Sequence, residues 1–122
     1  MKLGISILFV KDVSKAKDFY VNKLGINFIP PMSNDTFLTL KLEDDMLIGI
    51  QDIKTNPAIN LETFKTGSNE LGFEVKNIEE FWSKLKNMDL VITEIEEKPF
   101  GKVFYTKDPE GHYLSFYKPS FK

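Results

Sequence analysis

The stretch Asp108-Pro109-Glu110-Gly111-His112-Tyr113-Leu114-Ser115-Phe116-Tyr117 decides how the chain ends and what its last strand presents. Proline at the second position of a four-residue turn presets φ, and glycine at the fourth position tolerates the exit geometry. A β-branched and aromatic run, 103–106, precedes the turn, and large residues alternate after it. The stretch therefore predicts a hairpin, with one strand on each side of the turn.

The composition limits the classes of function. The 122 residues are enough for one domain with its own core, and the absence of cysteine excludes disulfides, thiolate nucleophiles and cysteine metal sites. All 16 basic residues are lysines and the net charge is −2, so the arginine forks and basic surface of phosphate- and nucleic-acid-binding proteins are missing. No apolar run has the roughly 18 residues of a membrane span, and the amino-terminal apolar run is too short for a secretory signal. We expect a cytoplasmic protein with no membrane or nucleic-acid partner.

Outward from the hairpin, the same order of elements is predicted twice. Strands are expected over 3–10, 26–29, 37–42 and 46–51, and again over 71–75, 91–95, 103–106 and 113–117. Asp12 and Asn77 are N-caps that begin helices, the first of which ends at Gly25. The second helix has apolar residues at i, i+3, i+4 and i+7: Ile78, Phe81, Trp82 and Leu85.

The two series are copies of one unit. Val10-Lys11-Asp12-Val13 and Val75-Lys76-Asn77-Ile78 carry the same strand-to-helix signal at an offset of 65 residues. Such a unit is too small to close a core alone, so the two copies should pair. The sequence predicts one α+β domain, 1–122, made of two tandem βαβββ modules, 1–51 and 69–122, joined by a polar connector, 52–68.

The order of these motifs resembles the vicinal oxygen chelate superfamily, which includes glyoxalase I, extradiol dioxygenases, and fosfomycin- and bleomycin-resistance proteins. The segments that look like its first half are 7–13, 16–20 and Leu24-Gly25, and Asp108-Pro109-Glu110-Gly111 looks like its closing signature. The resemblance implies a mixed sheet curled into a cup that holds a ligand on its concave side. In metal-using members, His and Glu side chains from the first strand of each half and from the last strands hold the ion.

Placed by the strand-exit signals, the family's metal positions fall on Ile5, Gly49 (or Gln51), Glu70 and Ser115. Only Glu70 keeps strong donor chemistry, and one carboxylate does not hold a catalytic transition metal. His112 lies three residues before Ser115 and so faces the other way along a strand, which leaves it as a turn residue. The chain therefore resembles the metal-free, bleomycin-resistance-like members, and we expect no metal and no cofactor.

Alternation along the strands extends the set of residues expected to face the cup. Besides Thr39, Lys41 and Gly72, the predicted ligand-binding set is Ile5, Ile7, Phe9, Phe37, Gly49, Gln51, Glu70, Glu74, Tyr113, Ser115 and Tyr117. Aromatic rings beside two carboxylates suit a flat, partly cationic organic molecule. Structural roles remain open, with Glu74 paired to Lys41 or another strand lysine and the two tyrosines in a dimer interface.

The predicted function is binding of a small molecule, such as a cationic aromatic drug, without chemistry. The alternative is a vicinal oxygen chelate enzyme, either lyase- or dioxygenase-like with a weak metal site around Glu70 and Gln51, or a metal-free acid–base isomerase with Glu70 as base. A structural or regulatory interaction domain is the third possibility. The resemblance also implies a homodimer, and since some members exchange halves between chains, any such exchange would cross 52–68.

Overall fold

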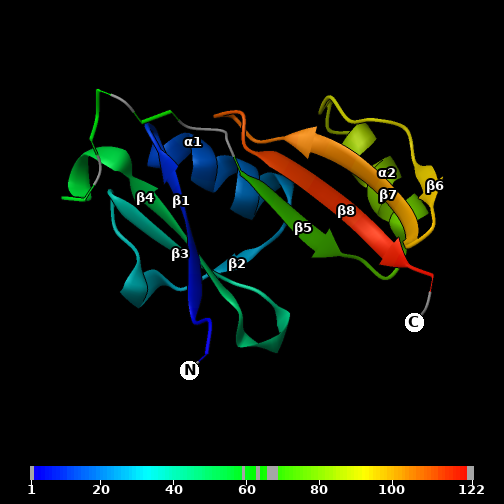
Figure 1. The fold of residues 1–122 in the computed structure, drawn as a ribbon, viewed down its shortest axis with the longest axis horizontal. Coiled ribbons are helices and arrows are strands. Elements are labelled where there is room, and N and C mark those ends of the chain that lie inside the picture. Colours follow the sequence, from blue (N-terminus) through cyan, green and yellow to red (C-terminus); the bar gives the residue numbers. More distant parts are fainter. Residues whose placement is uncertain (1, 59, 63, 66–68, 121–122) are drawn as a thin grey trace. The chain divides into compact units, whose positions relative to one another are not determined.

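The computed structural model describes residues 2–58, 60–62, 64–65 and 69–120. The chain divides into two compact units, Met1–Thr66 and Gly67–Lys122, each with its own four-stranded sheet (Figure 1). Both sheets mix parallel and antiparallel pairs, which confirms the predicted α+β fold of two tandem modules. No helix among the described residues is long and apolar enough to cross a membrane.

The sheet of the first unit has the order β1-β4-β3-β2. Its strands are β1 (Ile5–Val10), β2 (Asn27–Phe28), β3 (Phe37–Lys41) and β4 (Leu47–Asp52), which differ from the predicted strands by one or two residues at their ends. Short 3₁₀ turns, η2 (Pro30–Met32) and η3 (Glu43–Asp45), separate β2, β3 and β4. Six residues that alternate with those expected to face the cup are buried: Leu8, Val10, Leu38, Leu40, Ile48 and Ile50.

The first helix begins as predicted but widens after one turn. Asp12 caps α1 (Val13–Lys17), and its Oδ1 accepts a hydrogen bond from Lys15 N at 3.1 Å. The chain then continues as a π-helix, η1 (Asp18–Lys23), in which Leu24 N donates to Phe19 O at 2.9 Å. This wider turn buries Phe19, Tyr20 and Leu24 together, although two of them are neighbours in sequence. An α-helix pattern of period 3.6 did not predict it.

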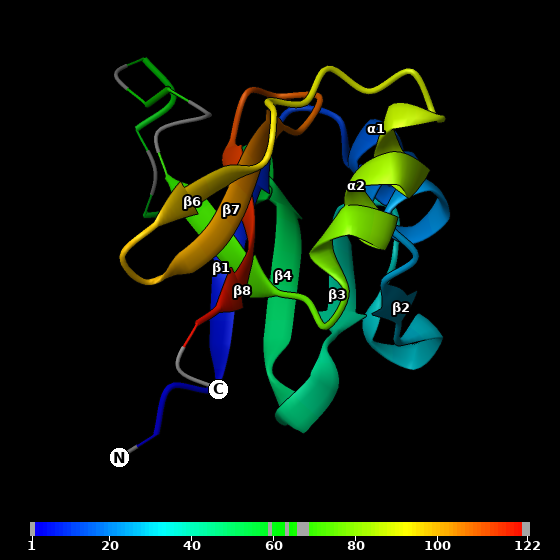
Figure 2. The ribbon, with the colours of Figure 1, turned by 90° about the vertical axis from the view of Figure 1, so that its right-hand side faces the viewer.

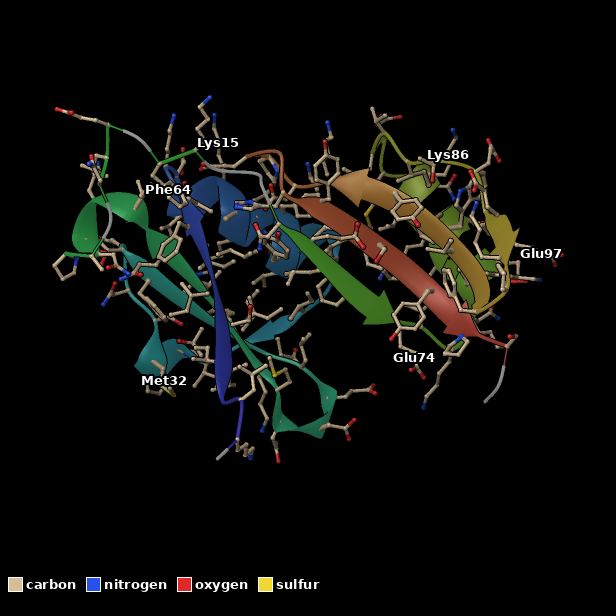
Figure 3. All side chains as sticks on the ribbon, viewed as in Figure 1. Lys15, Met32, Phe64, Glu74, Lys86 and Glu97 are labelled. Atoms are coloured by element: carbon tan, nitrogen blue, oxygen red, sulfur yellow. The ribbon has the colours of Figure 1, made fainter. Side chains whose placement is uncertain are left out.

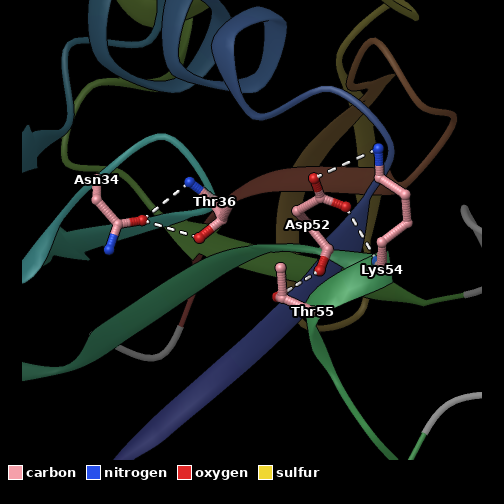
Figure 4. A network of polar contacts seen from close by, with 5 residues as sticks. All are labelled: Asn34, Thr36, Asp52, Lys54 and Thr55. Carbon is pink, nitrogen blue, oxygen red and sulfur yellow. Dashed lines mark hydrogen bonds and ion pairs between the residues drawn. The ribbon is translucent and has the colours of Figure 1, made fainter.

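The connector starts with an ordered turn rather than an irregular segment. The Asp52 carboxylate accepts from Lys54 N at 3.0 Å, and Thr55 Oγ1 donates to Asp52 O at 2.8 Å, which forms η4 (Ile53–Thr55) (Figure 4). Asn34 makes a similar turn before β3, where its Oδ1 accepts from Thr36 N at 2.9 Å. Residues 59, 63 and 66–68 of the predicted connector lie outside the described residues.

The sheet of the second unit has the order β5-β8-β7-β6. Its elements are β5 (Glu70–Glu74), α2 (Ile78–Lys86), β6 (Glu96–Lys98), β7 (Gly101–Lys107) and β8 (Tyr113–Pro119). The predicted cap is confirmed, because Asn77 Oδ1 accepts from Glu80 N at 3.1 Å. Helix α2 lies along one face of this sheet, where Phe81 meets Phe104 and Phe116 at ring-centroid distances of 6.4 and 4.9 Å (Figure 2).

The strand predicted over 91–95 is wrong. The segment has no strand, and the short β6 follows it instead. Side chains take the main-chain groups that a ladder would use: Trp82 Nε1 donates to Thr93 O, and Thr106 Oγ1 donates to Val91 O, both at 2.8 Å. Val91 is 91% exposed, so the apolar residues of this segment do not mark a buried strand.

The hairpin turn forms as predicted, and it encloses a buried pair of side chains. Gly111 has a φ of 84°, and its N–H donates to Asp108 O at 3.0 Å. Asp108 and His112 are both buried, with His112 Nδ1 2.7 Å from Asp108 Oδ2. Asp108 Oδ1 also accepts from the N–H groups of Glu110 and His112, each at 2.9 Å. His112 is therefore a buried residue that stabilises the turn through its contacts with Asp108.

Gly101 at the start of β7 allows a direct test of this hairpin. Its φ is 140°, and a Cβ there would overlap the Lys118 carbonyl oxygen and lie 2.9 Å from Ser120 N. We predict that Gly101→Ala lowers the free energy of unfolding in urea by more than about 2 kcal/mol, because backbone atoms cannot move aside cheaply. Gly4→Ala is the control, since a Cβ at Gly4 meets nothing within 4 Å. Equal stability of the two variants would contradict the described path of β7.

Candidate functional site

The face of the second sheet opposite α2 gathers tyrosine and glutamate side chains from three strands. The register aligns Lys107, Tyr113 and Glu70 in one row, Tyr105, Ser115 and Gly72 in the next, and Val103, Tyr117 and Glu74 in the third. Residues paired across strands share a face, so the members of these rows project to the same side. We call the following set the tyrosine–glutamate face: Glu70, Gly72, Glu74, Tyr105, Tyr113, Ser115 and Tyr117.

In the middle row of the tyrosine–glutamate face, Gly72 and Ser115 are small, whereas Tyr105 and the flanking rows carry larger side chains. Gly72 has no side chain, and a Cβ there would lie 3.1 Å from Ser115 Oγ and 3.6 Å from Tyr117 Cε1. Ser115 is buried and donates to Glu70 Oε2 at 3.3 Å, whereas Glu70 itself is exposed. A ligand lying over Gly72 would therefore meet a hydroxyl and a carboxylate that already contact each other, with tyrosine rings nearby.

Lysines border the tyrosine–glutamate face, but they have different partners. Lys98 is 2.9 Å from Glu96, and the hydrogen bond and charge of this carboxylate raise the pKa of Lys98. Lys107 Nζ instead stands 4.9 Å from the centroid of the ring of Tyr113, a residue that is 46% exposed. The ring quadrupole attracts a cation in this position. The Tyr113 ring thus already has an ammonium group over it.

Lys41 and Glu74 lie in different units, and the pairing of Glu74 with Lys41 or another strand lysine stays a prediction. Lys41 Nζ lies 3.5 Å from Asp45, four residues along its own unit. Glu74 lies exposed at the end of β5 (Figure 3).

The corresponding face of the first sheet carries apolar side chains, which occupy the space over its glycine. Ile7 and Gly49 form its middle row, and a Cβ at Gly49 would lie 2.6 Å from Phe37 Cζ and 3.3 Å from both Ile5 Cδ1 and Ile7 Cγ1. The ring of Phe37 thus occupies the space over the glycine. Toward the end of β1, the Phe9 ring meets the edge of Phe64 at a centroid distance of 5.5 Å (Figure 3).

Gln51 and Thr39 lie on this same side of the first sheet, and each makes a hydrogen bond with a nearby residue. Gln51 Oε1 accepts from Asn56 Nδ2 at 3.2 Å, and Thr39 Oγ1 donates to Met32 O at 2.6 Å. The structure therefore brings Ile5, Ile7, Phe37 and Gly49 together, with Phe9 and Gln51 at one end. These contacts hold local structure and leave no group on this face with strong donor chemistry.

The residues at the family's metal positions do not fit a metal ion. Glu70 and Ser115 contact each other, but a neutral hydroxyl is a weak ligand, and Ile5 and Gly49 offer no side-chain donor at all. Within 2–58, 60–62, 64–65 and 69–120, no three His, Cys, Asp or Glu side chains gather closely enough to hold a metal. His112 is held by Asp108 at the turn. The donor set supports binding by rings and one or two carboxylates rather than Lewis-acid chemistry.

Sequence reasoning missed two members of this region. Tyr105 was assigned to a strand but not to a face, and Lys107 was not considered. The hairpin gives a signal for both, because a turn at 108–111 brings Lys107 opposite Tyr113 and Tyr105 opposite Ser115. The cation over the Tyr113 ring is a side-chain contact that no periodicity reveals.

Comparison with known proteins agrees with this fold. The sequence profile of the glyoxalase-like domain matches residues 3–119. No curated protein sequence matches the chain at a significant level. Among solved structures, the antibiotic binding protein TnmS3 from Streptomyces sp. CB03234 is 20% identical, with a TM-score of 0.81 over 98% of this chain and 97% of that one.

Two other structures share the fold at low identity. Lactoylglutathione lyase from Agrobacterium tumefaciens is 13% identical, with a TM-score of 0.78 over 96% of this chain and 92% of that one. A glyoxalase/bleomycin resistance protein from Streptomyces sp. CB03234 is 19% identical, with a TM-score of 0.73 over 93% and 97%. These likenesses show the fold, and the profile match over nearly the whole length shows the family. The chain belongs to the glyoxalase-like domain family of the vicinal oxygen chelate superfamily.

Proposed function

We propose that the chain is a metal-free small-molecule binding protein whose ligand lies on the tyrosine–glutamate face. One observation carries the proposal: the small residues Gly72 of β5 and Ser115 of β8, which we call the low row, lie between Tyr113 and Tyr117, and Glu70 is hydrogen-bonded to Ser115 rather than placed in a set of metal donors. Tyrosine rings offer flat apolar area with a polar tip, and the carboxylates orient a polar or charged ligand group. A flat organic molecule fits this chemistry.

Two further points support binding without chemistry. In the first unit, Ile7 takes the position that Gly72 has in the second, and the Phe37 ring lies over its strand neighbour Gly49. Of the two described sheets, only the second therefore has the low row. One neighbour in fold, TnmS3, is named an antibiotic binding protein. That name concerns TnmS3, and the shared fold makes the same class of activity a reasonable proposal for this chain.

The resemblance to the family also supports a homodimer, and a cytoplasmic location stays a prediction. Light scattering on the purified chain decides the first of these proposals. A monomeric mass would contradict the dimer and leave the binding proposal unaffected.

A larger side chain in the low row should weaken ligand binding. Gly72→Val suits a strand but places two methyl groups beside Ser115 Oγ and Tyr117. We predict that it weakens binding of 10-methylacridinium, a flat fluorescent cation, by roughly tenfold or more in a fluorescence titration. Gly4→Val, whose side chain meets nothing nearby, should bind as the wild type does. Unchanged affinity of Gly72→Val, or no binding of flat aromatic compounds by the wild type, would contradict the proposal.

Metal analysis separates this proposal from an enzyme of the same superfamily. We predict that protein purified from medium supplemented with Ni²⁺, Zn²⁺, Mn²⁺ and Fe²⁺ carries no stoichiometric metal by mass spectrometry, because Glu70 has no second strong donor at the equivalent positions. Dialysis against a chelator should leave ligand affinity unchanged. A metal bound at one per chain and lost in Glu70→Gln would instead favour a lyase- or dioxygenase-like activity.

A further inference from the structure

We infer that the tyrosine–glutamate face selects an aromatic organic cation, and that Lys107 is a built-in competitor which this cation displaces from Tyr113. The inference rests on the proposed function and adds the charge of the ligand and the residue that regulates its affinity. Three observations carry it: the position of the Lys107 ammonium, the partners of the neighbouring lysines, and the carboxylate on the other side of Tyr113.

The Lys107 ammonium marks the Tyr113 ring as a place for a cation. Lys107 and Tyr113 are paired directly across β7 and β8, and the ammonium nitrogen lies 4.9 Å from the ring centroid. This distance is within the range of about 6 Å over which a cation is attracted to a tyrosine ring. Tyr113 is 46% exposed as a residue, so another cation can approach it from solvent. A ligand cation would therefore take over an interaction that the protein already makes with its own side chain.

Lys107 is held more loosely than Lys98 and Lys102 of the same sheet. Lys98 contacts Glu96 at 2.9 Å, and Lys102 contacts Glu79 at 3.0 Å, which raises the pKa of Lys102 through that hydrogen bond and charge. No carboxylate of the described residues lies within ion-pair distance of Lys107. Its side chain is exposed, and a four-carbon stem reorients easily into water. Displacement of Lys107 therefore breaks a ring contact and no ion pair.

The Glu70 carboxylate beside Tyr113 offers an incoming cation a second favourable interaction, in addition to the ring contact that Lys107 now makes. Glu70 lies in the same row on the opposite side of Tyr113, with β8 between it and Lys107. The Cα atoms of Glu70 and Lys107 are two strand spacings apart, about 10 Å, which separates the two side chains. Glu70 is bonded only weakly by Ser115, at 3.3 Å. A positively charged group over Tyr113 gains both the ring and this carboxylate, whereas a neutral ring gains only stacking.

Two nearly isosteric probes test this inference. The ligands 10-methylacridinium, a permanent cation, and acridine, which is neutral at pH 8, have the same ring system, and fluorescence reports the binding of each. We expect the wild type to bind the cation more tightly. Lys107→Met should tighten cation binding by roughly two- to fivefold through loss of the competing ammonium. Glu70→Gln should weaken it by a similar factor, roughly two- to fivefold. Acridine affinity should stay unchanged in Glu70→Gln, because a neutral ligand does not use the carboxylate charge.

Lys118→Met controls for net charge. Lys118 follows Tyr117 on β8, so it points to the other side of the sheet, and its removal changes the net charge by the same amount. We expect it to leave both affinities unchanged. Equal affinity of the two acridines, or a Lys107→Met effect matched by Lys118→Met, would overturn the inference and leave small-molecule binding intact. Failure of both probes to bind would contradict the proposed function as well.

Discussion

The structure depends on a constraint that acts in each sheet separately: a single helix covers one face, and alternation along the strands sends every second residue to the other. In the second unit Phe81 packs on Phe116 at a centroid distance of 4.9 Å, and the neighbouring Ser115 and Tyr117 must then face away. In the first unit the burial of Leu8 and Val10 fixes the direction of Ile7 and Phe9 in the same way. The helix contacts thus determine which side chains are available to a ligand.

The two sheets share this plan but differ in what the second face holds. In the first sheet, Phe37 reaches over Gly49 and contacts the region of Ile5 and Ile7, which gives an apolar surface with its own packing. In the second sheet, the equivalent middle row is Gly72 and Ser115, and rings and carboxylates lie around it. One duplicated architecture therefore supports a mainly structural surface in one unit and a chemically varied surface in the other. The difference lies in few side chains, which is why fold likeness alone does not assign function.

The sequence predicts most of the fold because its local signals agree with the tertiary contacts. The caps Asp12 and Asn77 and the turn at Asp108–Gly111 form as expected, and the residues expected to pack toward the helices, such as Leu8, Leu38 and Leu114, are buried. The failures have identifiable causes. The apolar residues of 91–95 suggest a strand, but the side chains of Trp82 and Thr106 use its carbonyl groups. The π-helix after Lys17, the His112–Asp108 pair and the Lys107–Tyr113 contact arise from packing between side chains, which residue spacing does not encode.

The central claim is that the tyrosine–glutamate face, and not the face under α2, receives the ligand. The most direct measurement is a map of amide chemical-shift changes on adding 10-methylacridinium to the isotope-labelled protein. The account predicts the largest changes in β5 and β8, at Glu70, Gly72, Tyr113 and Ser115, with Lys107 of β7 also affected. Changes confined to α2, or to the face of the first sheet that carries Phe37, would contradict it.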